Sequence, residues 1–590
     1  MSLLRREGEL VDVAAEVDPH LEIAEIHRRV IAAGGPALLF EKPTGARLPV
    51  VTNLFGSARR TERAFGPWPR RFIERAARLP EELMPPSFSK LWQQRDLLAP
   101  ALRLGMRGMK RTPVREVRHV DPRLSELPLL TSWPEDGGPF LTLPLVYTES
   151  PAGSGRGNLG IYRMQRFDDR RMGMHWQIGK GGGFHYAEAE AAGRPLPVSV
   201  FLGGPPALVL SAVAPLPEGV PELLLASLLL GERLPRSTSD IDPHPLLSEC
   251  EIALVGEVPP HERRPEGPFG DHYGYYSLQH DYPVFHCRTM YRRKDAMMPA
   301  TVVGKPRQED FYIGDYLQEL LSPIFPVVMP AVRDLWSYGE TGYHSLAAAV
   351  VADRYPREAM ASAFRILGEG QLSLTKFLIL VDRPMELRNF RAVLSYALER
   401  CDFRSDLYVF GNLSMDTLDY NGPAVNSGSK GVLLGMGESK RELPVSFSGT
   451  VFGLRHVEIF SPGCLVIEGP SYSQEPGAGA RIAQHEAFRE WPLIILTDDA
   501  RRCAKSPTNF LWTVFTRFEP AADIHAAKVE LKRLHPSFTP PILIDARLKP
   551  GFPRELNCDE ETAERVTRRW HEYFPEGGVE MGDSGRANLD

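Results

Sequence analysis

Six β-rich runs between residues 143 and 293 constrain the fold of this chain more than any other feature of its sequence. The runs are LPLVYTES, NLGIYRMQRF, LPVSVFLG, ALVLSAV, EIALVGEV and VFHCRTMYRR. Each is rich in β-branched and aromatic residues and is bounded by Gly or Pro turns, which is typical of short strands. The pattern predicts an all-β barrel or sandwich interrupted by one helix at Val220–Glu232, with Pro221 and Glu222 in its first turn.

The sequence on either side of these runs mixes helix and strand. Near the N-terminus, ALLFEK and LPVVTNLFGS read as strands and residues 59–78 as a helix. After about residue 330, PREAMASAFRILGEG and MELRNFRAVLSYALERC read as helices that precede the strands TKFLILVD and DLYVFGN. This alternation predicts an α/β layer. A strand at WPLIILTDD and helices at NFLWTVFTRF and ETAERVTRRWHEYF follow, and no internal repeat is visible.

The length of 590 residues is too great for one compact core. We therefore expect an α+β and α/β multidomain protein with four segments. These are an N-terminal α/β portion at 1–126, a β-barrel domain at 127–325, a C-terminal α/β domain at 326–505, and a C-terminal extension at 506–590 that forms oligomer contacts or covers the site.

Composition excludes several classes of protein. The net charge of −6 provides no cationic field for nucleic acid. No apolar run reaches the roughly 18 residues of a transmembrane helix, and the N-terminus lacks an apolar signal core. The six cysteines are scattered singly, without zinc spacing or a disulfide framework. We expect a cytoplasmic protein.

A loop at residues 262–276, ERRPEGPFGDHYGYY, carries the strongest chemical signal. Glu266 and Asp271 lie five residues apart, separated by two glycines and a proline that make a helix unfavourable. A rigid loop can aim both carboxylates at one point, where each shifts the pKa of the other and suits them to proton transfer. A polar surface turn is the alternative.

Two residues in NLGIYRMQ suggest ligand binding. Asn158 can supply an oxygen ligand to a hard metal ion, and Arg163 can form a forked pair with a carboxylate. The alternatives are a turn asparagine and a solvated arginine on a strand.

The segment HWQIGKGGGFH, residues 175–185, combines Lys180 with three glycines beginning at Gly181. Glycines let backbone amides approach an anion, and the lysine adds a positive charge for phosphate. The spacing matches neither a dinucleotide fingerprint nor a Walker loop, and a flexible hairpin loop is the alternative. Lys430, in NSGSKGVLLG, is a second cation in a loop of small residues, and could equally belong to a surface turn.

A mixed nitrogen and oxygen metal site is the remaining candidate. His185 is a possible ligand or a structural hydrogen-bonding residue. Glu222 either stabilises the helix dipole or needs a partner because the following LLLASLLL is apolar. Together with Asn158 these residues would suit Mn²⁺ or Mg²⁺, which near a phosphate would bridge protein and cofactor.

Taken together, these segments resemble the UbiD family of carboxylases and decarboxylases. The matching pieces are TNLFGS (52–57), NLGIYRMQ (158–165), HWQIGKGGGFHY (175–186), LPVSVFLGGPPALVLSAVAPLPEGVPE (196–222), PEGPFGDHYGYY (265–276) and NSGSKG (426–431). They occur in family order over residues 50–435. The resemblance implies an N-terminal α/β portion, a central split barrel like that of flavin reductases, and a C-terminal α/β domain.

The resemblance also implies a cofactor, prenylated FMN, bound with Mn²⁺ and often with K⁺. Asn158, His185 and Glu222 match the metal positions, although some members lack a histidine at the position of His185. Backbone carbonyls near Ser211 and Ala212 match the potassium position. The positions around the flavin or its phosphate match Ile161, Tyr162, Arg163, Lys180, Gly181 and Lys430. The catalytic Glu-Arg-Glu/Asp network maps onto Glu266, Arg163 and Asp271.

The expected activity is decarboxylation of an aromatic or α,β-unsaturated acid, such as a ubiquinone or menaquinone precursor. Loss of CO₂ leaves electron density that no side chain can delocalise, so a cofactor must supply the electron sink. The expected partners are a flavin prenyltransferase as cofactor supplier and further copies of the chain, as a dimer or hexamer. A prenylated substrate would require access to a bilayer at the protein surface. The alternatives are a non-catalytic flavin-binding or assembly subunit of a carboxylase and a metal-dependent hydrolase.

Overall fold

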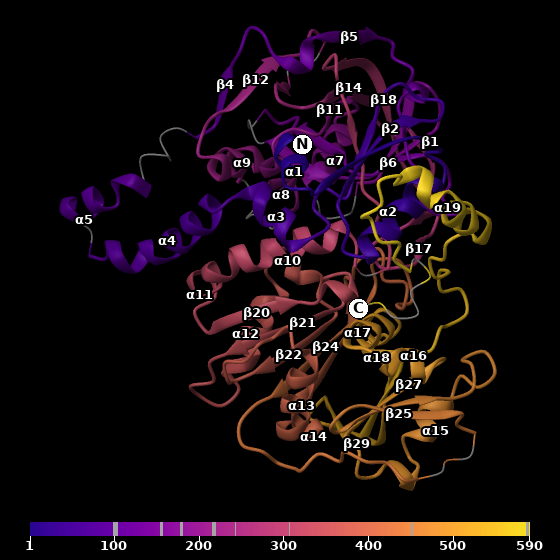
Figure 1. Cartoon of the computed structure of the whole chain (residues 1–590). Coiled ribbons are helices and arrows are strands. Elements are labelled where there is room, and N and C mark those ends of the chain that lie inside the picture. Colours follow the sequence, from indigo (N-terminus) through magenta and orange to yellow (C-terminus); the bar gives the residue numbers. More distant parts are fainter. Residues whose placement is uncertain are drawn as a thin grey trace. The chain divides into compact units, whose positions relative to one another are not determined.

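The computed structural model describes residues 1–85, 87–97, 104–153, 157–176, 181–214, 220–241, 244–305, 307–449, 451, 453–583, 585 and 589. Contacts divide the chain into two compact units, coloured along the sequence in Figure 1. The first unit comprises Met1–Leu320 and Glu555–Gly585, and the second comprises Leu321–Arg554 and Arg586–Asp590. The expected C-terminal extension at 506–590 is shared between the two units. The four segments expected from the sequence remain predictions.

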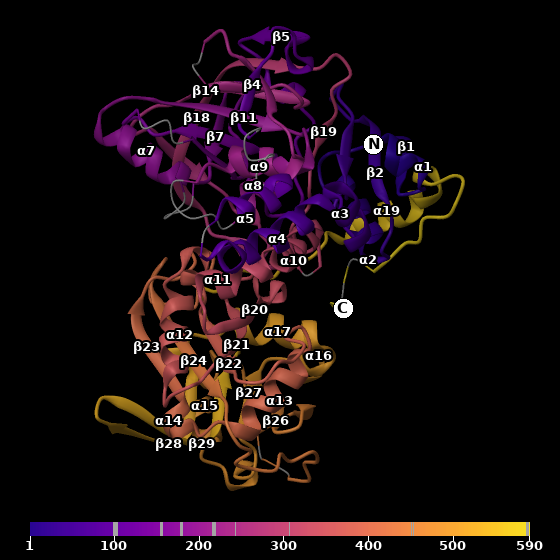
Figure 2. The ribbon, with the colours of Figure 1, turned by 90° about the vertical axis from the view of Figure 1, so that its left-hand side faces the viewer.

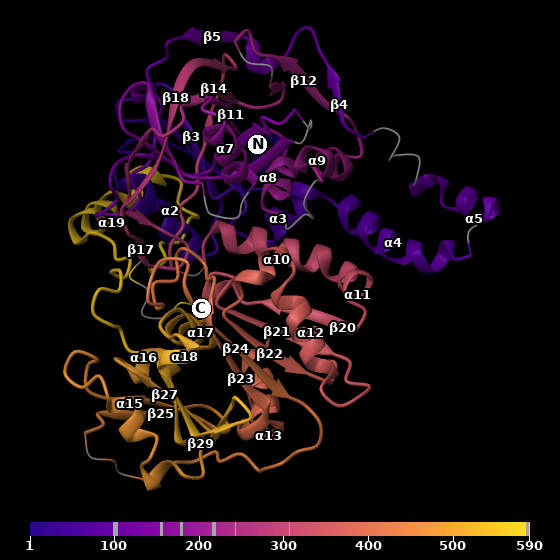
Figure 3. The same cartoon turned by 180° about the vertical axis from the view of Figure 1, so that it is seen from behind.

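The centre of the first unit is a curled ten-stranded sheet, seen from behind in Figure 3. Its strands run in the order β6-β9-β10-β18-β14-β11-β7-β8, with β15 and β5 also paired to β18, and every pairing is antiparallel. This sheet confirms the predicted β-rich middle of the chain. The strands are β5 (Val117–Val120), β6 (Phe140–Leu141), β7 (Leu145–Glu149), β8 (Gly157–Ile161), β9 (Met164–Arg166), β10 (Arg171–Met174), β11 (Leu196–Leu202), β14 (Ile252–Val258), β15 (Arg263–Glu266) and β18 (His280–Arg292).

Alternation in these strands builds the core on one face of the sheet. Val198 and Val200 of β11 and Leu254 of β14 are fully buried in one cluster with Phe285 of β18. Two smaller sheets accompany the curled sheet in this part of the unit. They are β13-β12-β4, with β4 (Met106–Gly108), β12 (Leu234–Thr238) and β13 (Pro245–Leu247), and β16-β17, with β16 (Phe269–Gly270) and β17 (Tyr276–Ser277).

Three helices, not the single one predicted, interrupt the β-region. The prediction for 220–232 is confirmed by α9 (Glu222–Leu230), which ends at Gly231 in the left-handed conformation that suits glycine. The predicted strand ALVLSAV is wrong, because these residues form α8 (Pro206–Val213), which begins at a proline in its first turn. The segment after Lys180 forms α7 (Gly181–Ala191), where Ala and Glu outweigh the helix-breaking glycines at its start.

The N-terminal part of the first unit is a four-stranded sheet in the order β1-β2-β3-β19. Residues 59–78 form two helices rather than one, because Gly66 ends α3 with a positive φ and Pro67 precedes α4. The elements are β1 (Leu10–Val17), β2 (Ala37–Pro43), β3 (Val50–Thr52), β19 (Met298–Pro299), α1 (Ser2–Arg6), α2 (Glu22–Ala32), α3 (Ala58–Phe65), α4 (Trp68–Leu83), α5 (Phe88–Gln93), α10 (Glu309–Leu321) and, returning from the C-terminal end, α19 (Glu560–Tyr573).

The second unit contains two sheets with the same strand order and the same directions of pairing, seen in Figure 2. In each, an antiparallel edge strand, three mutually parallel strands and a second antiparallel edge strand follow one another. The first sheet is β20 (Val332–Ser337), β21 (Leu346–Val351), β22 (Phe377–Val381), β24 (Gly428–Gly435) and β23 (Leu407–Leu413). The second is β25 (His456–Ser461), β26 (Cys464–Glu468), β27 (Leu493–Thr497), β29 (His535–Asp545) and β28 (Ile524–Lys532).

The helices of this unit repeat in the same way. After β22, Asn389 caps α13 (Phe390–Arg400), and after β27, Ser506 caps α17 (Pro507–Thr516). A short helix follows each of them, and its last residue is an aspartate that accepts a hydrogen bond from the backbone N–H of the residue before the helix. Asp406 Oδ2 accepts from Asp402 N–H at 2.7 Å, and Asp523 Oδ2 accepts from Glu519 N–H at 2.7 Å. The unit is therefore a structural duplication, which the sequence did not show. Its other helices are α11 (Phe325–Val328), α12 (Glu358–Leu367), α14 (Phe403–Asp406), α15 (Ala478–Ile482), α16 (Ala500–Ala504) and α18 (Pro520–Asp523).

One hydrophobic core joins the two sheets of the second unit. Phe390 of the first half lies 5.9 Å from Phe510 of the second half, and Phe510 stacks on Phe460 at 3.7 Å between ring centroids. The two halves therefore stabilise each other. In the part of the chain that the structure describes, no helix has the length and apolar character needed to span a membrane.

Candidate active site

Arg163 lies between β8 and β9 and is almost fully buried. Its Nε donates to Glu266 Oε1 at 3.0 Å and its Nη2 donates to Ser277 Oγ at 2.9 Å. Nη1 forms an ion pair with Asp271 Oδ2. The two carboxylates that the sequence placed on one loop thus meet the predicted arginine, which is the arrangement expected of an acid network.

The backbone of residues 266–271 is held by side chains from outside the loop. Gly267 N–H donates to Gln165 Oε1 at 2.8 Å, and Gly270 N–H donates to Asp136 Oδ1 at 2.8 Å. Glu266 ends β15 and Asp271 follows β16, so each carboxylate leaves from the end of a strand. A loop with satisfied amides has few alternative conformations, so both carboxylates are presented to Arg163 in fixed positions.

The electrostatics of the network keep it ionised. Burial raises the pKa of Glu266, but the charge of Arg163 and the hydrogen bond from His175 outweigh it and lower the pKa to about 2. The pKa of Asp271 is likewise raised by burial and then held well below its usual range by Arg163 and His272. Burial lowers the pKa of Arg163, but the two carboxylates more than compensate and raise it. In this state Asp271 carries no proton.

Two histidines extend the network in different directions. Burial and the charge of Arg163 lower the pKa of His175, so it is neutral, and its Nδ1 donates to Glu266 at 3.1 Å. His272 Nδ1 contacts Asp271 Oδ1 at 2.7 Å. The side chain of His272 is 26% exposed, against 10% for Asp271. His272 therefore connects the buried acid to solvent.

The three predicted metal ligands gather around the start of β8. Leu159 N–H, next to Asn158, donates to Glu222 Oε2 at 3.0 Å. Thr148 is paired with Asn158 across β7 and β8, and its hydroxyl contacts His185 Nδ1 at 2.9 Å. Burial raises the pKa of Glu222 and lowers that of His185. Among the described residues, no group of three His, Cys, Asp or Glu side chains could by itself hold a metal ion.

The residues predicted to contact the flavin surround this same strand end. Tyr162 is buried, and its hydroxyl accepts from Asn158 Nδ2 at 3.5 Å and from the backbone of Gly182. Gly181 lies so close to Asn158 that a Cβ would stand 2.2 Å from its amide oxygen. Ile161 is half-buried at the end of β8. The glycines after Lys180 thus permit a close approach of α7 to β8.

The contacts above include neither of the two predicted lysines. Lys180 lies outside the described residues. Lys430 lies on β24 of the second unit, where its Nζ donates to Thr375 O at 2.8 Å. Burial and the nearby charge of Lys376 lower the pKa of Lys430 to about 8, against the opposing effect of two aspartates. Its role at a cofactor phosphate stays a prediction.

Sequence reasoning did not assign a role to four residues of this network. They are His175, Ser277, Gln165 and Asp136, which contact Glu266, Arg163 or the loop backbone. Gln165 follows Arg163 at the strand spacing that puts both on one face, which was the only available signal. Ser277 directly follows the loop at the end of β17, whereas His175 and Asp136 are distant from the loop in sequence, so no spacing pattern relates those two to it.

Comparison with known proteins gives the chain a family context. Three family models match the chain: the 3-octaprenyl-4-hydroxybenzoate carboxy-lyase N-terminal domain at residues 1–79, the Rift-related domain at 107–306 and the C-terminal domain at 311–435. The sequence is 52% identical over 578 residues to a Chlamydia pneumoniae protein named as a subunit of 4-hydroxybenzoate decarboxylase, with 98% of each chain covered.

Solved structures show the same fold at low sequence identity. The closed form of a vanillic acid decarboxylase from Sedimentibacter hydroxybenzoicus is 24% identical and matches with a TM-score of 0.65, over 76% of this chain and 94% of the other. The UbiD-class enzyme HmfF from Pelotomaculum thermopropionicum, solved in complex with FMN, is 23% identical and matches with a TM-score of 0.61, over 74% and 92%.

Proposed function

The chain belongs to the UbiD family of carboxy-lyases, and on this premise we propose that it catalyses the reversible, non-oxidative decarboxylation of an aromatic or α,β-unsaturated acid with prenylated FMN. The observation that supports the proposal most is the buried Arg163 held between Glu266 and Asp271. A protein that only bound flavin would have no need of this costly arrangement of three buried charges.

The region around β8 and α7 fits a flavin with a phosphate. Gly157, Gly160, Gly181 and Gly182 all approach neighbouring side chains too closely for a Cβ, so glycine allows β8 and α7 to pack closely around the proposed ligands. Trp176 Nε1 is buried without a hydrogen-bond partner among the described residues, so it has a donor to offer. When bound, prenylated FMN supplies the electron sink for the charge that departing CO₂ leaves behind.

Arg163 is the group that would bind the substrate carboxylate, through charge-assisted hydrogen bonds. Its Nε and Nη2 are directed at Glu266 and Ser277, and its Nη1 is directed at Asp271. A substrate carboxylate must therefore compete with Asp271 for Nη1. Glu266 would keep Arg163 charged and oriented throughout.

This competition would also load Asp271 with a proton. Without the full attraction of Arg163, and with a second carboxylate beside it, burial dominates and the pKa of Asp271 rises. Asp271 then takes a proton and delivers it to the carbon that loses CO₂. His272 would return a proton from solvent to Asp271 after each turnover, because it is the more exposed partner of this acid.

A metal ion would be held by Asn158, His185 and Glu222. An amide oxygen, an imidazole and a carboxylate form the donor set that suits Mn²⁺. Thr148 would fix the ring of His185 through Nδ1 and leave Nε2 for the metal. The potassium ion predicted near Ser211 and Ala212 is part of the same proposal.

A hydroxylated benzoic acid is the first substrate to test. A protein that shares 52% identity over nearly the whole chain is named as part of a 4-hydroxybenzoate decarboxylase. Polyprenyl hydroxybenzoate and naphthoate precursors of quinones form the second group. We further propose that a flavin prenyltransferase supplies the cofactor and that the chain forms a homo-oligomer.

The decisive experiment is co-expression with a flavin prenyltransferase and anaerobic purification. The released cofactor is identified by absorption and mass, bound metal by elemental analysis, and activity by exchange of substrate C–H for deuterium and by CO₂ release from 4-hydroxybenzoate. Prenylated FMN, Mn²⁺ and exchange together are expected. A chain that binds the cofactor but catalyses no C–H exchange on any of the aromatic acids tested would instead be the assembly subunit.

A further inference from the structure

The last segment of the first unit, Glu555–Gly585, begins beside the loop that carries Asp271. Glu555 forms an antiparallel β-bridge with Tyr275, and Leu556 N–H donates to Gly274 O at 3.0 Å. Within the loop, Gly274 N–H donates to Asp271 O at 2.9 Å, and Asp271 N–H donates to Tyr275 O at 3.1 Å. We call Glu555–Asn557 the strap. It adds a paired edge to the turn formed by residues 271–275.

The strap also packs against the residue that precedes Asp271. Leu556 is fully buried in a cluster with Trp133 and Tyr276. The indole of Trp133 lies so close to Gly270 that a Cβ there would stand 2.0 Å from Trp133 Cδ1. Leu556 and Gly270 therefore both pack against the indole, and loss of the leucine would leave a cavity beside Trp133.

The buried Lys305 holds the strap in place. Lys305 is 5% exposed, and its Nζ lies 2.6 Å from Glu555 Oε1 and 3.0 Å from Asn557 Oδ1. A buried ammonium group must be paired, so these contacts hold both ends of the strap at one point.

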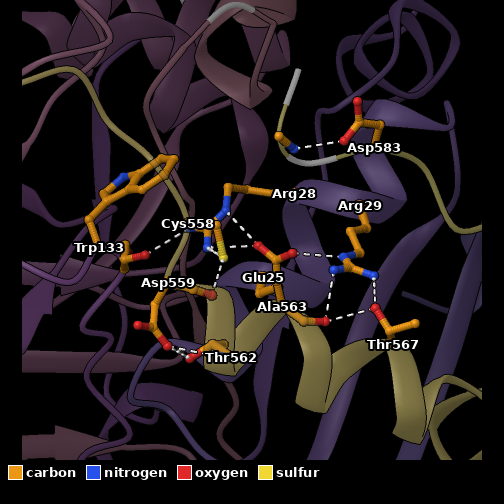
Figure 4. Close-up of polar contacts among 12 residues, drawn as sticks. Glu25, Arg28, Arg29, Trp133, Cys558, Asp559, Thr562, Ala563, Thr567 and Asp583 are labelled. Atoms are coloured by element: carbon orange, nitrogen blue, oxygen red, sulfur yellow. Dashed lines mark hydrogen bonds and ion pairs between the residues drawn. The ribbon is translucent and has the colours of Figure 1, made fainter. Parts of the chain in front are cut away.

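The helix after the strap is anchored to the N-terminal part of the same unit, as Figure 4 shows. Arg29 of α2 donates to Ala563 O at 2.9 Å and to Thr567 Oγ1 at 2.7 Å on α19. Glu25 binds Arg29 at 2.7 Å and Arg28 at 3.0 Å. These buried charged contacts attach α19 firmly to α2.

The same arginine pair links the anchor to the acid loop. Arg28 Nη1 donates to Ser132 O at 2.7 Å, and its guanidinium lies 4.1 Å from the centre of the Trp133 ring. Ser132 and Trp133 donate their backbone N–H groups to Asp136, which also accepts from Gly270 N–H. A continuous set of contacts therefore runs from α19 to the residue before Asp271.

We propose that the strap is a positioning element that holds Asp271 at Arg163. The role rests on the proposed function, since Asp271 is the proposed acid. The chain leaves the first unit at residue 320 and returns only at residue 555, after the whole second unit. The segment that completes the acid loop therefore lies well beyond residue 435, where the family models end.

The test compares two buried apolar truncations in the returning segment. Leu556→Ala removes the contact with Trp133, whereas Val566→Ala creates a cavity of similar kind on α19, away from the acid loop. Hydrogen exchange is measured on the flavin-free chain for residues 270–277. We expect Leu556→Ala to speed exchange there by about 10-fold or more, and Val566→Ala to leave it near the wild-type rate.

Turnover is then measured on the cofactor-loaded enzyme. Leu556→Ala should lower kcat about 10-fold or more, with KM within about 3-fold and flavin content unchanged, because a misplaced acid slows proton transfer without weakening binding. Asn557→Ala, an exposed and milder change, should also speed hydrogen exchange at residues 270–277 and lower kcat, each by a smaller factor.

Equal exchange at residues 270–277 in Leu556→Ala and Val566→Ala would overturn the proposal, as would faster exchange with an unchanged kcat. Absence of turnover in the wild-type enzyme would contradict the proposed function instead. Exchange in the flavin-free chain would still decide whether the strap holds the turn.

Discussion

The proposed mechanism requires Asp271 to be ionised in the free site and protonated when the substrate carbon needs a proton. Its pKa is held low chiefly by Arg163 against the effect of burial, so the substrate carboxylate itself is the natural trigger for protonation. This requirement distinguishes Asp271 from Glu266. Glu266 receives two hydrogen bonds from Arg163 and one from His175, and both of these partners are buried.

Asp271→Asn should abolish proton transfer while leaving the cofactor site intact. We expect turnover to fall by about 10³-fold or more, with flavin content unchanged, because an amide cannot donate a proton to carbon. Steady-state kinetics and flavin absorption measure the two effects. Asp121→Asn, an exposed aspartate paired with Arg170, is the control and should behave like wild type. Full activity in Asp271→Asn would remove this residue from the mechanism.

His272→Gln tests the route by which the proton returns. The substitution removes a titratable group beside Asp271 but keeps a polar side chain, so we expect kcat to fall about 10–100-fold with little change in KM. Added imidazole should restore part of the rate in the variant and none in wild type. An unaltered pH profile of kcat in His272→Gln would mean that solvent reaches Asp271 by another route.

The low pKa of Glu266 makes its ion pair sensitive to acid. A carboxyl whose folded pKa is about 2, below its ordinary 4.5, stabilises the fold above about pH 4.5 and loses that contribution as the pH falls toward 2. Wild type should therefore exceed Glu266→Gln in Tm above pH 5, and the difference should shrink steadily below pH 4.5. Thermal melts at several pH values measure it; a constant difference would contradict the assigned ionisation.

At the scale of elements, the close contact of α7 with β8 depends on glycine. A Cβ at residue 181 would stand 2.2 Å from Asn158 Oδ1, so Gly181→Ala must displace the proposed metal ligand. We expect Mn²⁺ affinity to fall by about 10-fold or more, measured by calorimetry or electron paramagnetic resonance. Gly108→Ala, on β4 with no atom within 4 Å of the added Cβ, is the control. Equal affinities would exclude Asn158 as a ligand.

Strand alternation predicted most of the curled sheet, and helical periodicity predicted α12, α13, α17 and α19. Periodicity could not separate strand from helix in ALVLSAV, because a short apolar run suits either and only the preceding proline favoured helix. The loop spacing of Glu266 and Asp271 revealed two of the three acid-network residues. Ser277 and His175 join it through tertiary contacts, which leave no local pattern.

The duplication in the second unit could not be predicted from the sequence either, because the two halves have little side-chain pattern in common. The two halves share strand order, caps and hydrogen bonds, but their side chains differ at the positions that carry charge. By strand register, Pro492 and Pro541 of the second half stand where the first half has the buried Lys376 and Lys430. The two halves share strand order and core, whereas these two positions carry buried lysines in the first half and prolines in the second.

At the scale of the whole molecule, the second unit is a single core made from two similar sheets. Phe377 and Phe390 of the first half pack on Phe460, Phe510, Phe515 and Phe518 of the second. Burying an aromatic side chain removes about 150–250 Å² from water, worth about 25 cal/mol per Å². Exposing the two phenylalanines of the first half would thus cost up to about 8–12 kcal/mol, comparable with the entire stability of a domain.

A fragment ending at residue 435, where the family match ends, should therefore fail to fold, whereas a fragment of residues 321–554 should fold by itself. The longer fragment keeps both sheets and the shared core, and contacts assign all its residues to one unit. Cooperative thermal unfolding and dispersed amide signals in an NMR spectrum are expected for 321–554 and not for 321–435. The complementary fragment 436–554 should also fail, since it lacks Phe377 and Phe390. A folded 321–435 fragment would show that the two halves are independent domains, and that the shared aromatic core is a late contact between them.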